Sequence, residues 1–224
     1  MKFHLRQMQL LEKSLTLGSL FSQPKVEGII LPDNLKEIGD EIVNRREEIY
    51  PGCMDVENDE DFDFIKKDWA SYHDYVCMDV FPKLRFLFPY IAESLEMVGD
   101  SYKDYYFKSW INIWPNKQSI NPHIHYGEWH GYYVIRDTGT ETYYVDSEIP
   151  TKRTIVPLTN FDGHYVFMPA KVLHWAQKNP KKELRLSMGF NLSSWSEVLR
   201  EEQEDSNGRG KNIKNVVLPL KNYI

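Results

Sequence analysis

The pattern of hydrophobic and polar positions predicts helices in the first half of the chain. Within residues 32–50, Leu35, Ile38 and Ile42 recur at helical spacing with charged residues between them. Asp33 directly precedes this segment, where its carboxylate can cap a helix amino terminus. We therefore predict a helix over most of residues 32–50.

Two further helices are predicted over residues 69–80 and 82–98. Pro82 suits the first turn of a helix, and Gly99 follows where the second of these helices should stop. Pro89 falls inside the second segment, where it removes a backbone donor and clashes with the preceding turn. It predicts a kink or break there.

After Gly99 the pattern changes to short, aromatic and β-branched runs. Residues 105–114 read YYFKSWINIW and carry no helix signal. Similar runs separated by turn-forming residues follow at 131–136, 141–146, 153–158, 163–168 and 184–192. Helices followed by many short strands predict an α+β protein, in which a helical flank packs on a β-sandwich or barrel.

We expect one domain over residues 1–224. Residues 1–100 would form a leading arm (1–30) and the helical flank, and residues 101–198 the β core. Residues 199–224 would form a linker and a short C-terminal tail, because the stretch from 200 to 213 is polar and contains glycine.

Composition narrows the classes of function. A hydrophobic content of 42% supports a real core and excludes global disorder. The net charge of −6 and the pI near 5.7 disfavour nucleic acid as a partner, because phosphate binding usually needs a basic surface. Two cysteines, Cys53 and Cys77, and the lack of any long apolar run predict a cytoplasmic protein that does not enter membranes.

The densest candidate chemistry lies in the stretch NPHIHYGEWHGYY, which begins at Asn121. His123 and His125 are two residues apart, so on an extended segment they project from one face, roughly 7 Å apart at the Cα atoms. Two imidazoles so placed can share one metal ion, which needs at least a third protein ligand. His174, in GHYVFMPAKVLHWAQKN, is the best third candidate.

The last strand-like run, LRLSMGFNL, alternates between an apolar and a polar face. Its polar face carries Arg185 and Ser187. Such a pair can hold a carboxylate, because the guanidinium offers two parallel donors and the hydroxyl a third. The alternative is a strand side that faces solvent.

The order of these motifs resembles that of the Fe(II)- and 2-oxoglutarate-dependent oxygenases, in particular their small bacterial and phage-type branch. The matching stretches are WINIWPNKQSINPHIHYGEWHGYYVI and DGHYVFMPAKVLHWAQKNPKKELRLSMGFNL, and the likeness covers roughly residues 107–195. The resemblance implies a double-stranded β-helix (jelly-roll) core with iron at one mouth. It makes His123 the first ligand and His174 the distal one.

The same resemblance implies the binding of the co-substrate 2-oxoglutarate. Arg185 with Ser187 would bind its C5 carboxylate, and Tyr133 would assist. Iron would activate O2, and hydroxylation of a C–H bond would follow. The first substrate to consider is a protein or peptide side chain of the prolyl type.

The sequence departs from the family pattern at the second ligand. The usual motif is H-x-D or H-x-E, and here that acidic position is His125. We predict that His125 is the ligand, because it shares a strand face with His123. Glu128 is the alternative: it would point the other way on a regular strand, unless Gly127 supplies a bend.

Two other functions remain open from the sequence. H-x-H-x-x-E and the later histidine imperfectly resemble the motifs of cupin-like metal enzymes or binding proteins that use no 2-oxoglutarate, and a non-catalytic interaction domain on a jelly-roll is the other alternative. We expect His130 to be a surface or supporting residue and not a ligand. Trp110 and Trp129 are the tryptophans expected near the substrate mouth.

Overall fold

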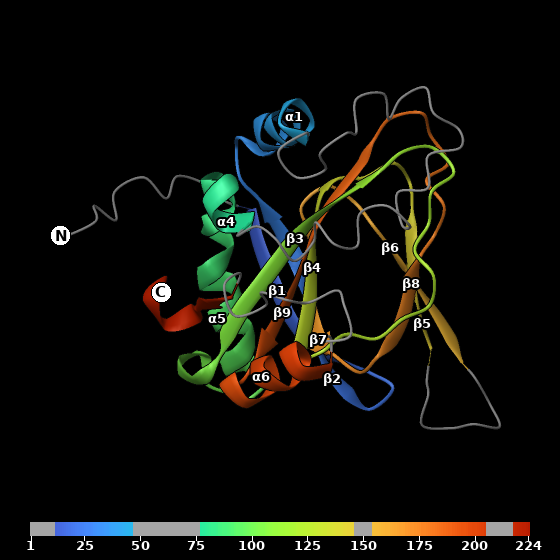
Figure 1. Ribbon diagram of the computed structural model, residues 1–224. Coiled ribbons are helices and arrows are strands. Elements are labelled where there is room, and N and C mark those ends of the chain that lie inside the picture. Colours follow the sequence, from blue (N-terminus) through green and yellow to red (C-terminus); the bar gives the residue numbers. More distant parts are fainter. Residues whose placement is uncertain (1–11, 47–76, 146–153, 205–216) are drawn as a thin grey trace.

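Two antiparallel sheets face one another in the computed structural model, which describes residues 12–46, 77–145, 154–204 and 217–224 (Figure 1). Within these residues the large sheet has seven strands, in the order β1 (Glu12–Leu20), β2 (Gln23–Leu31), β7 (His164–Pro169), β4 (Trp129–Arg136), β9 (Arg185–Ser193), β3 (Tyr106–Trp114) and β10 (Leu218–Pro219). The small sheet has the order β6 (Ile155–Thr159), β5 (Glu141–Val145) and β8 (Leu173–Ala176).

The chain passes back and forth between the two sheets from β3 onward. After β3 in the large sheet, His123 forms an isolated bridge with His174 of β8 in the small sheet. The chain then returns to β4, crosses to β5 and β6, returns to β7, crosses to β8 and returns to β9 of the large sheet. This path is that of a double-stranded β-helix, so the predicted fold is confirmed.

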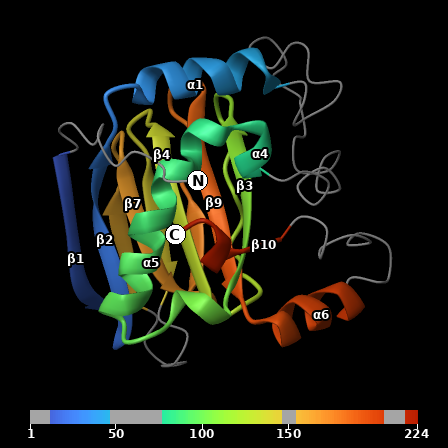
Figure 2. The ribbon, with the colours of Figure 1, turned by 90° about the vertical axis from the view of Figure 1, so that its left-hand side faces the viewer.

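Helices cover the outer face of the large sheet. They are α1 (Leu35–Asn44), α4 (Cys77–Val80), the 3-10 helix η2 (Pro82–Leu87) and α5 (Phe88–Met97); Figure 2 shows α1, α4 and α5 on this face. Their apolar residues join those of the large sheet in one core, and residues between the two sheets form a second. The helical flank is therefore confirmed, and the predicted break at Pro89 falls where η2 gives way to α5.

The predicted leading arm, residues 1–30, is part of the large sheet where the structure describes it, from residue 12 onward. Residues 12–31 form a β-hairpin, β1 and β2, which extends the large sheet beyond β7. Phe21 and Ser22 make its turn with φ values of 52° and 64°. A two-residue turn of this kind favours Asn and Gly, so the sequence lacked the usual hairpin signal.

Strand β8 and helix α6 (Trp195–Glu204) are among the elements that were not predicted. Strand β8 escaped prediction because its four residues carry no alternation long enough to recognise. Helix α6 occupies part of the predicted linker. The predicted helix at 69–80 is described only from Cys77 onward, and the rest of it lies outside the described residues.

A buried ion pair attaches α6 to the large sheet. Lys108 Nζ on β3 donates to Glu201 Oε1 at 2.8 Å, and each side chain is only 6% exposed. Removing one partner leaves the other charge buried without its counter-ion. We therefore expect Glu201→Gln to lower the free energy of unfolding by about 3–5 kcal/mol, measured by urea denaturation.

Glu197→Gln is the matched control on the same helix, because its partner Arg200 is 47% exposed. This change should cost no more than about 1 kcal/mol. Equal losses in the two variants would contradict a special contribution from the buried pair.

Candidate metal centre and co-substrate pocket

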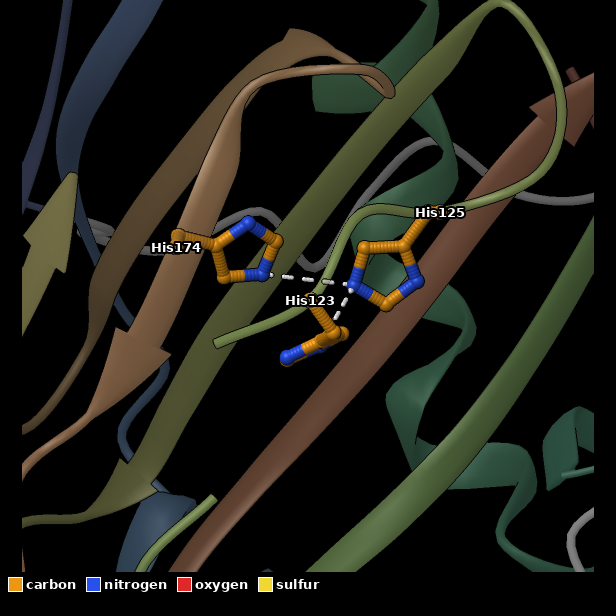
Figure 3. A group of neighbouring side chains, drawn as sticks. All are labelled: His123, His125 and His174. Carbon is orange, nitrogen blue, oxygen red and sulfur yellow. Dashed lines mark hydrogen bonds between the residues drawn. The ribbon is translucent and has the colours of Figure 1, made fainter. Parts of the chain in front are cut away.

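Three histidines from distant parts of the chain point their Nε2 atoms at one another (Figure 3). His125 Nε2 lies 3.1 Å from His123 Nε2 and 3.3 Å from His174 Nε2. Candidate ligand atoms of all three lie within 4.8 Å of one another. The structure thus brings together the three residues that the sequence predicts as ligands.

Backbone pairing between the two segments makes this approach possible. His123 N donates to His174 O at 2.9 Å, and His174 N donates to His123 O at 3.1 Å. Two residues further along, His125 N donates to Ala170 O at 2.9 Å. The sheet ladder therefore fixes the distance between residues that are far apart in sequence.

Hydrogen bonds to carbonyl oxygens fix the tautomer of two of the three imidazoles. His123 Nδ1 lies 2.8 Å from Asn121 O, and His174 Nδ1 lies 2.9 Å from Val172 O. A carbonyl can only accept, so each Nδ1 carries the proton and each Nε2 keeps its lone pair. Nitrogen lone pairs that face one another in this way need a cation or a shared proton between them.

Two of the three distances between the donors match the spacing of ligands around one transition-metal ion. Metal–nitrogen bonds of about 2.1 Å place two nitrogens about 3.0 Å apart at a right angle and about 3.4 Å apart at the tetrahedral angle. The observed 3.1 and 3.3 Å fall in this interval. Imidazole donors suit iron, zinc, copper and nickel, so the donor set selects a transition metal over calcium or magnesium.

Burial keeps these imidazoles neutral, which is the form that binds metal. It lowers the pKa of His123, lowers that of His125 well below its usual value, and lowers the pKa of His174 to about 3. Neighbouring histidines lower the last two pKa values further.

The metal-free protein should consequently lose stability as the pH falls below 6.5. Between the unfolded pKa of about 6.5 and the folded value, the unfolded chain binds a proton at His174 and the native state does not. The free energy of unfolding should thus decrease by about 1.4 kcal/mol per pH unit from this group alone, or about 2 kcal/mol between pH 6.5 and pH 5. Urea denaturation in the presence of a chelator measures it.

His174→Leu is the control, because it should flatten this dependence by that amount. Glu27 would add its own pH dependence, because its pKa is about 2 in the folded state and near 4.5 in the unfolded state. Measurements above pH 5 avoid most of this contribution. The same slope in the wild-type protein and in His174→Leu would contradict a neutral, buried His174.

A pocket between the sheets leads from the three histidines to Arg185. The guanidinium is only 4% exposed, and its Nε has no hydrogen-bond partner among the described residues. Asp137 Oδ1 is 4.0 Å from this Nε, too far for a hydrogen bond. Arg185 is thus a buried cation with an unused hydrogen-bond donor, and it borders the cavity. Such a group is suited to bind an anionic ligand.

Ser187 also lines this pocket, two residues along β9, and its Oγ accepts a bond from Asn112 Nδ2 at 3.4 Å. The polar face predicted for the last strand therefore looks into the cavity and not into solvent. Strand pairing explains this, because β9 lies between β3 and β4 and is buried on both faces.

Tyr133 lies on the wrong side of the sheet for the role expected of it. Its hydroxyl donates to Ile30 O at 2.7 Å in the core beneath the helices. Tyr132, one residue earlier, lines the pocket instead. Trp129 likewise points away and donates from Nε1 to Asp100 Oδ2 at 2.9 Å, whereas Trp110 lines the pocket as expected.

The carboxylate of Glu128 lies outside the cluster of candidate ligands found among the described residues. Its Oε2 accepts a bond from Ser194 N at 3.0 Å, at the start of α6. The geometry thus favours His125 over Glu128 as the third donor.

Asn112 and Tyr132 line the pocket, although neither was predicted to do so. His130, expected at the surface or in a supporting role, lines it as well. All three lie two residues from another pocket-lining residue on the same strand, and side chains two apart on a strand point to the same face. That signal becomes usable only once one residue of each strand has been placed.

No model of a known protein family matches the sequence, and no curated protein matches it. None of the described helices has the length and apolarity that crossing a bilayer requires.

Solved structures similar to the chain include three enzymes. One is the alpha-ketoglutarate-dependent epimerase SnoN from nogalamycin biosynthesis, with 17% identity over 52% of this chain and 57% of that one, at a TM-score of 0.43. A second is a prolyl-4-hydroxylase from Pseudomonas putida, with 14% identity, 77% and 89% coverage and a TM-score of 0.45. A third is the alpha-ketoglutarate-dependent carbocyclase SnoK, with 14% identity, 77% and 80% coverage and a TM-score of 0.48.

The chain spans less than two thirds of the length of SnoN. Because these TM-scores are below 0.5, we assign the fold from the strand order described above and not from these structures. Fold and site together define a double-stranded β-helix protein with three convergent imidazoles and a buried arginine in one pocket.

Proposed function

We propose that the protein is an Fe(II)- and 2-oxoglutarate-dependent dioxygenase that hydroxylates a C–H bond. One observation supports this most strongly: a single pocket carries three neutral imidazole donors at one end and an arginine with an unused donor at the other. A ligand that bridges the two ends needs a carboxylate for the arginine and a chelating group for the metal. 2-Oxoglutarate has both.

His123, His125 and His174 would hold the iron. Three side chains on one side leave the remaining coordination positions to small molecules. Iron bound there would supply the activation of O2 that is coupled to the oxidative decarboxylation of 2-oxoglutarate to succinate and CO2. With three neutral donors, the metal site is one charge more positive than with the usual carboxylate.

Arg185 and Ser187 would position the co-substrate. The guanidinium can donate two parallel hydrogen bonds to the C5 carboxylate, and the hydroxyl of Ser187 can add a third. Burial strengthens this pairing, because the surroundings screen it less than water does. Tyr132 replaces Tyr133 as the tyrosine available to assist, since it lines the pocket.

A protein or peptide side chain of the prolyl type is the first prime substrate to test. Ile124 and Tyr126, which flank His125, are 51% and 43% exposed. Apolar side chains beside the metal end can pack against an extended peptide.

The test is succinate release from 2-oxoglutarate by the purified protein with Fe(II) and ascorbate, without a prime substrate. We expect slow, uncoupled turnover that requires both iron and 2-oxoglutarate. Absence of iron binding would overturn the proposal.

The three-histidine donor set also favours a second candidate, a cupin-like metal enzyme or binding protein that uses no 2-oxoglutarate. This function has no need of Arg185. Metal binding that requires His174, without any effect of 2-oxoglutarate on the metal site, would support it in place of the oxygenase.

A further inference from the structure

The ring of His125 lacks the support that orients the other two candidate ligands. His123 and His174 each donate from Nδ1 to a backbone carbonyl. Both hydrogen bonds that the His125 side chain makes with the described residues involve Nε2, so its Nδ1 has no such partner among them. Something else must fix the plane of this ring.

His130 supplies that support by stacking. Its ring is parallel to that of His125, with an interplanar angle of 7° and ring centroids 3.6 Å apart. His130 is only 4% exposed, and its candidate ligand atoms are outside the three-histidine cluster. It therefore touches the flat face of His125 without competing for the same ion.

Asn191 fixes His130 in turn. His130 Nδ1 lies 3.1 Å from Asn191 Oδ1, and the two residues are direct cross-strand partners on β4 and β9. An amide oxygen accepts, so Nδ1 of His130 carries the proton and the ring cannot turn without losing this bond. Two rigid strands thus hold the ring against which His125 rests.

We propose that His130, held by Asn191, is a positioning residue that keeps the Nε2 of His125 aimed at the metal. The inference rests on the proposed metal centre and deepens it. It also gives a physical reason why an imidazole can serve at position 125: its aromatic face stacks on the ring of His130, which helps to fix its plane. Residues that orient a metal ligand without binding the metal typically change metal affinity 10–100-fold when removed.

The experiment is a Co(II) titration of the full chain, followed through the visible absorption bands of the bound metal, with Co(II) alone as the probe. His130→Ala removes the stacking surface and should weaken Co(II) binding by about 10–100-fold and change the band positions. His130→Phe and Asn191→Ala each keep a flat ring beside His125 but lose the hydrogen bond that holds this ring. Both should therefore bind Co(II) more weakly than the wild type and more tightly than His130→Ala.

His164→Ala is the matched control. It also removes a buried imidazole with a side-chain partner, because His164 on β7 pairs with Glu27 on β2. Its Co(II) affinity and spectrum should equal those of the wild type. Thermal unfolding of each metal-free variant shows that a loss of affinity does not reflect a loss of fold.

Two results would overturn the inference, and they differ. Wild-type affinity and an unchanged spectrum in His130→Ala, while His174→Ala loses Co(II), would refute the role of His130 and leave the proposed function intact. Failure of the wild-type protein to bind Co(II) would refute the metal centre itself.

Discussion

Replacing His174 by alanine is expected to abolish metal binding and, with it, the release of succinate. His174 is the most enclosed of the three candidate ligands, 6% exposed, and its Nε2 faces the other two rings. Loss of a residue that only supports a ligand costs 10–100-fold in metal affinity, so loss of a ligand should cost at least about 100-fold. Isothermal titration with Fe(II) under anaerobic conditions, or with Co(II), measures this.

His164→Ala again serves as the control for removing a buried imidazole. Its ring pairs with Glu27 and lies outside the pocket lining, so metal affinity and succinate release should be unchanged. If His174→Ala retains wild-type metal affinity, the three-histidine site is wrong.

Replacing Arg185 by alanine should remove 2-oxoglutarate binding while leaving the metal in place. Truncating one partner of a buried charge pair typically costs 2–5 kcal/mol, so the affinity for 2-oxoglutarate should fall at least about 30-fold. In the free protein the Nε of this guanidinium has no hydrogen-bond partner among the described residues, so the fold should tolerate its loss. Co(II) titration with and without 2-oxoglutarate separates the two effects.

Two further variants separate the contributions of the guanidinium and of the neighbouring hydroxyl: Arg185→Lys and Ser187→Ala. Lysine retains the charge but not the planar fork, and it should recover only part of the affinity. Loss of the Ser187 hydroxyl should cost about 1 kcal/mol, because it removes one hydrogen bond. Unimpaired 2-oxoglutarate turnover in Arg185→Ala would refute the assigned carboxylate site.

Much of the β core could be read from local pattern. The period of two over β9 placed Arg185 and Ser187 on one face, and both line the pocket. Pro89 marked a real break between two helices. These features depend on residues close in sequence, whose conformation is governed by periodicity and backbone stereochemistry.

The local sequence could not show which side chains of β4 face the pocket and which face the core under the helices. The run HGYYVI has no apolar–polar alternation, because this strand is covered by helices on one side and by the small sheet on the other. The local sequence therefore could not show which of Tyr132 and Tyr133 faces the pocket. Neighbouring residues on a strand point to opposite faces, so an error of one residue places a side chain in the core and not in the pocket.

By itself, the sequence determined the kinds of side chain available for chemistry and their spacing along each strand, since both follow from local geometry. Tertiary structure alone decided that His123 pairs with His174 at the β8 edge of the small sheet and that His130 stacks on His125. It also decided that Arg185 is buried with no hydrogen-bond partner for its Nε among the described residues. Each depends on strand register between segments distant in sequence. Register is set by how whole faces pack together, which no single stretch of residues specifies.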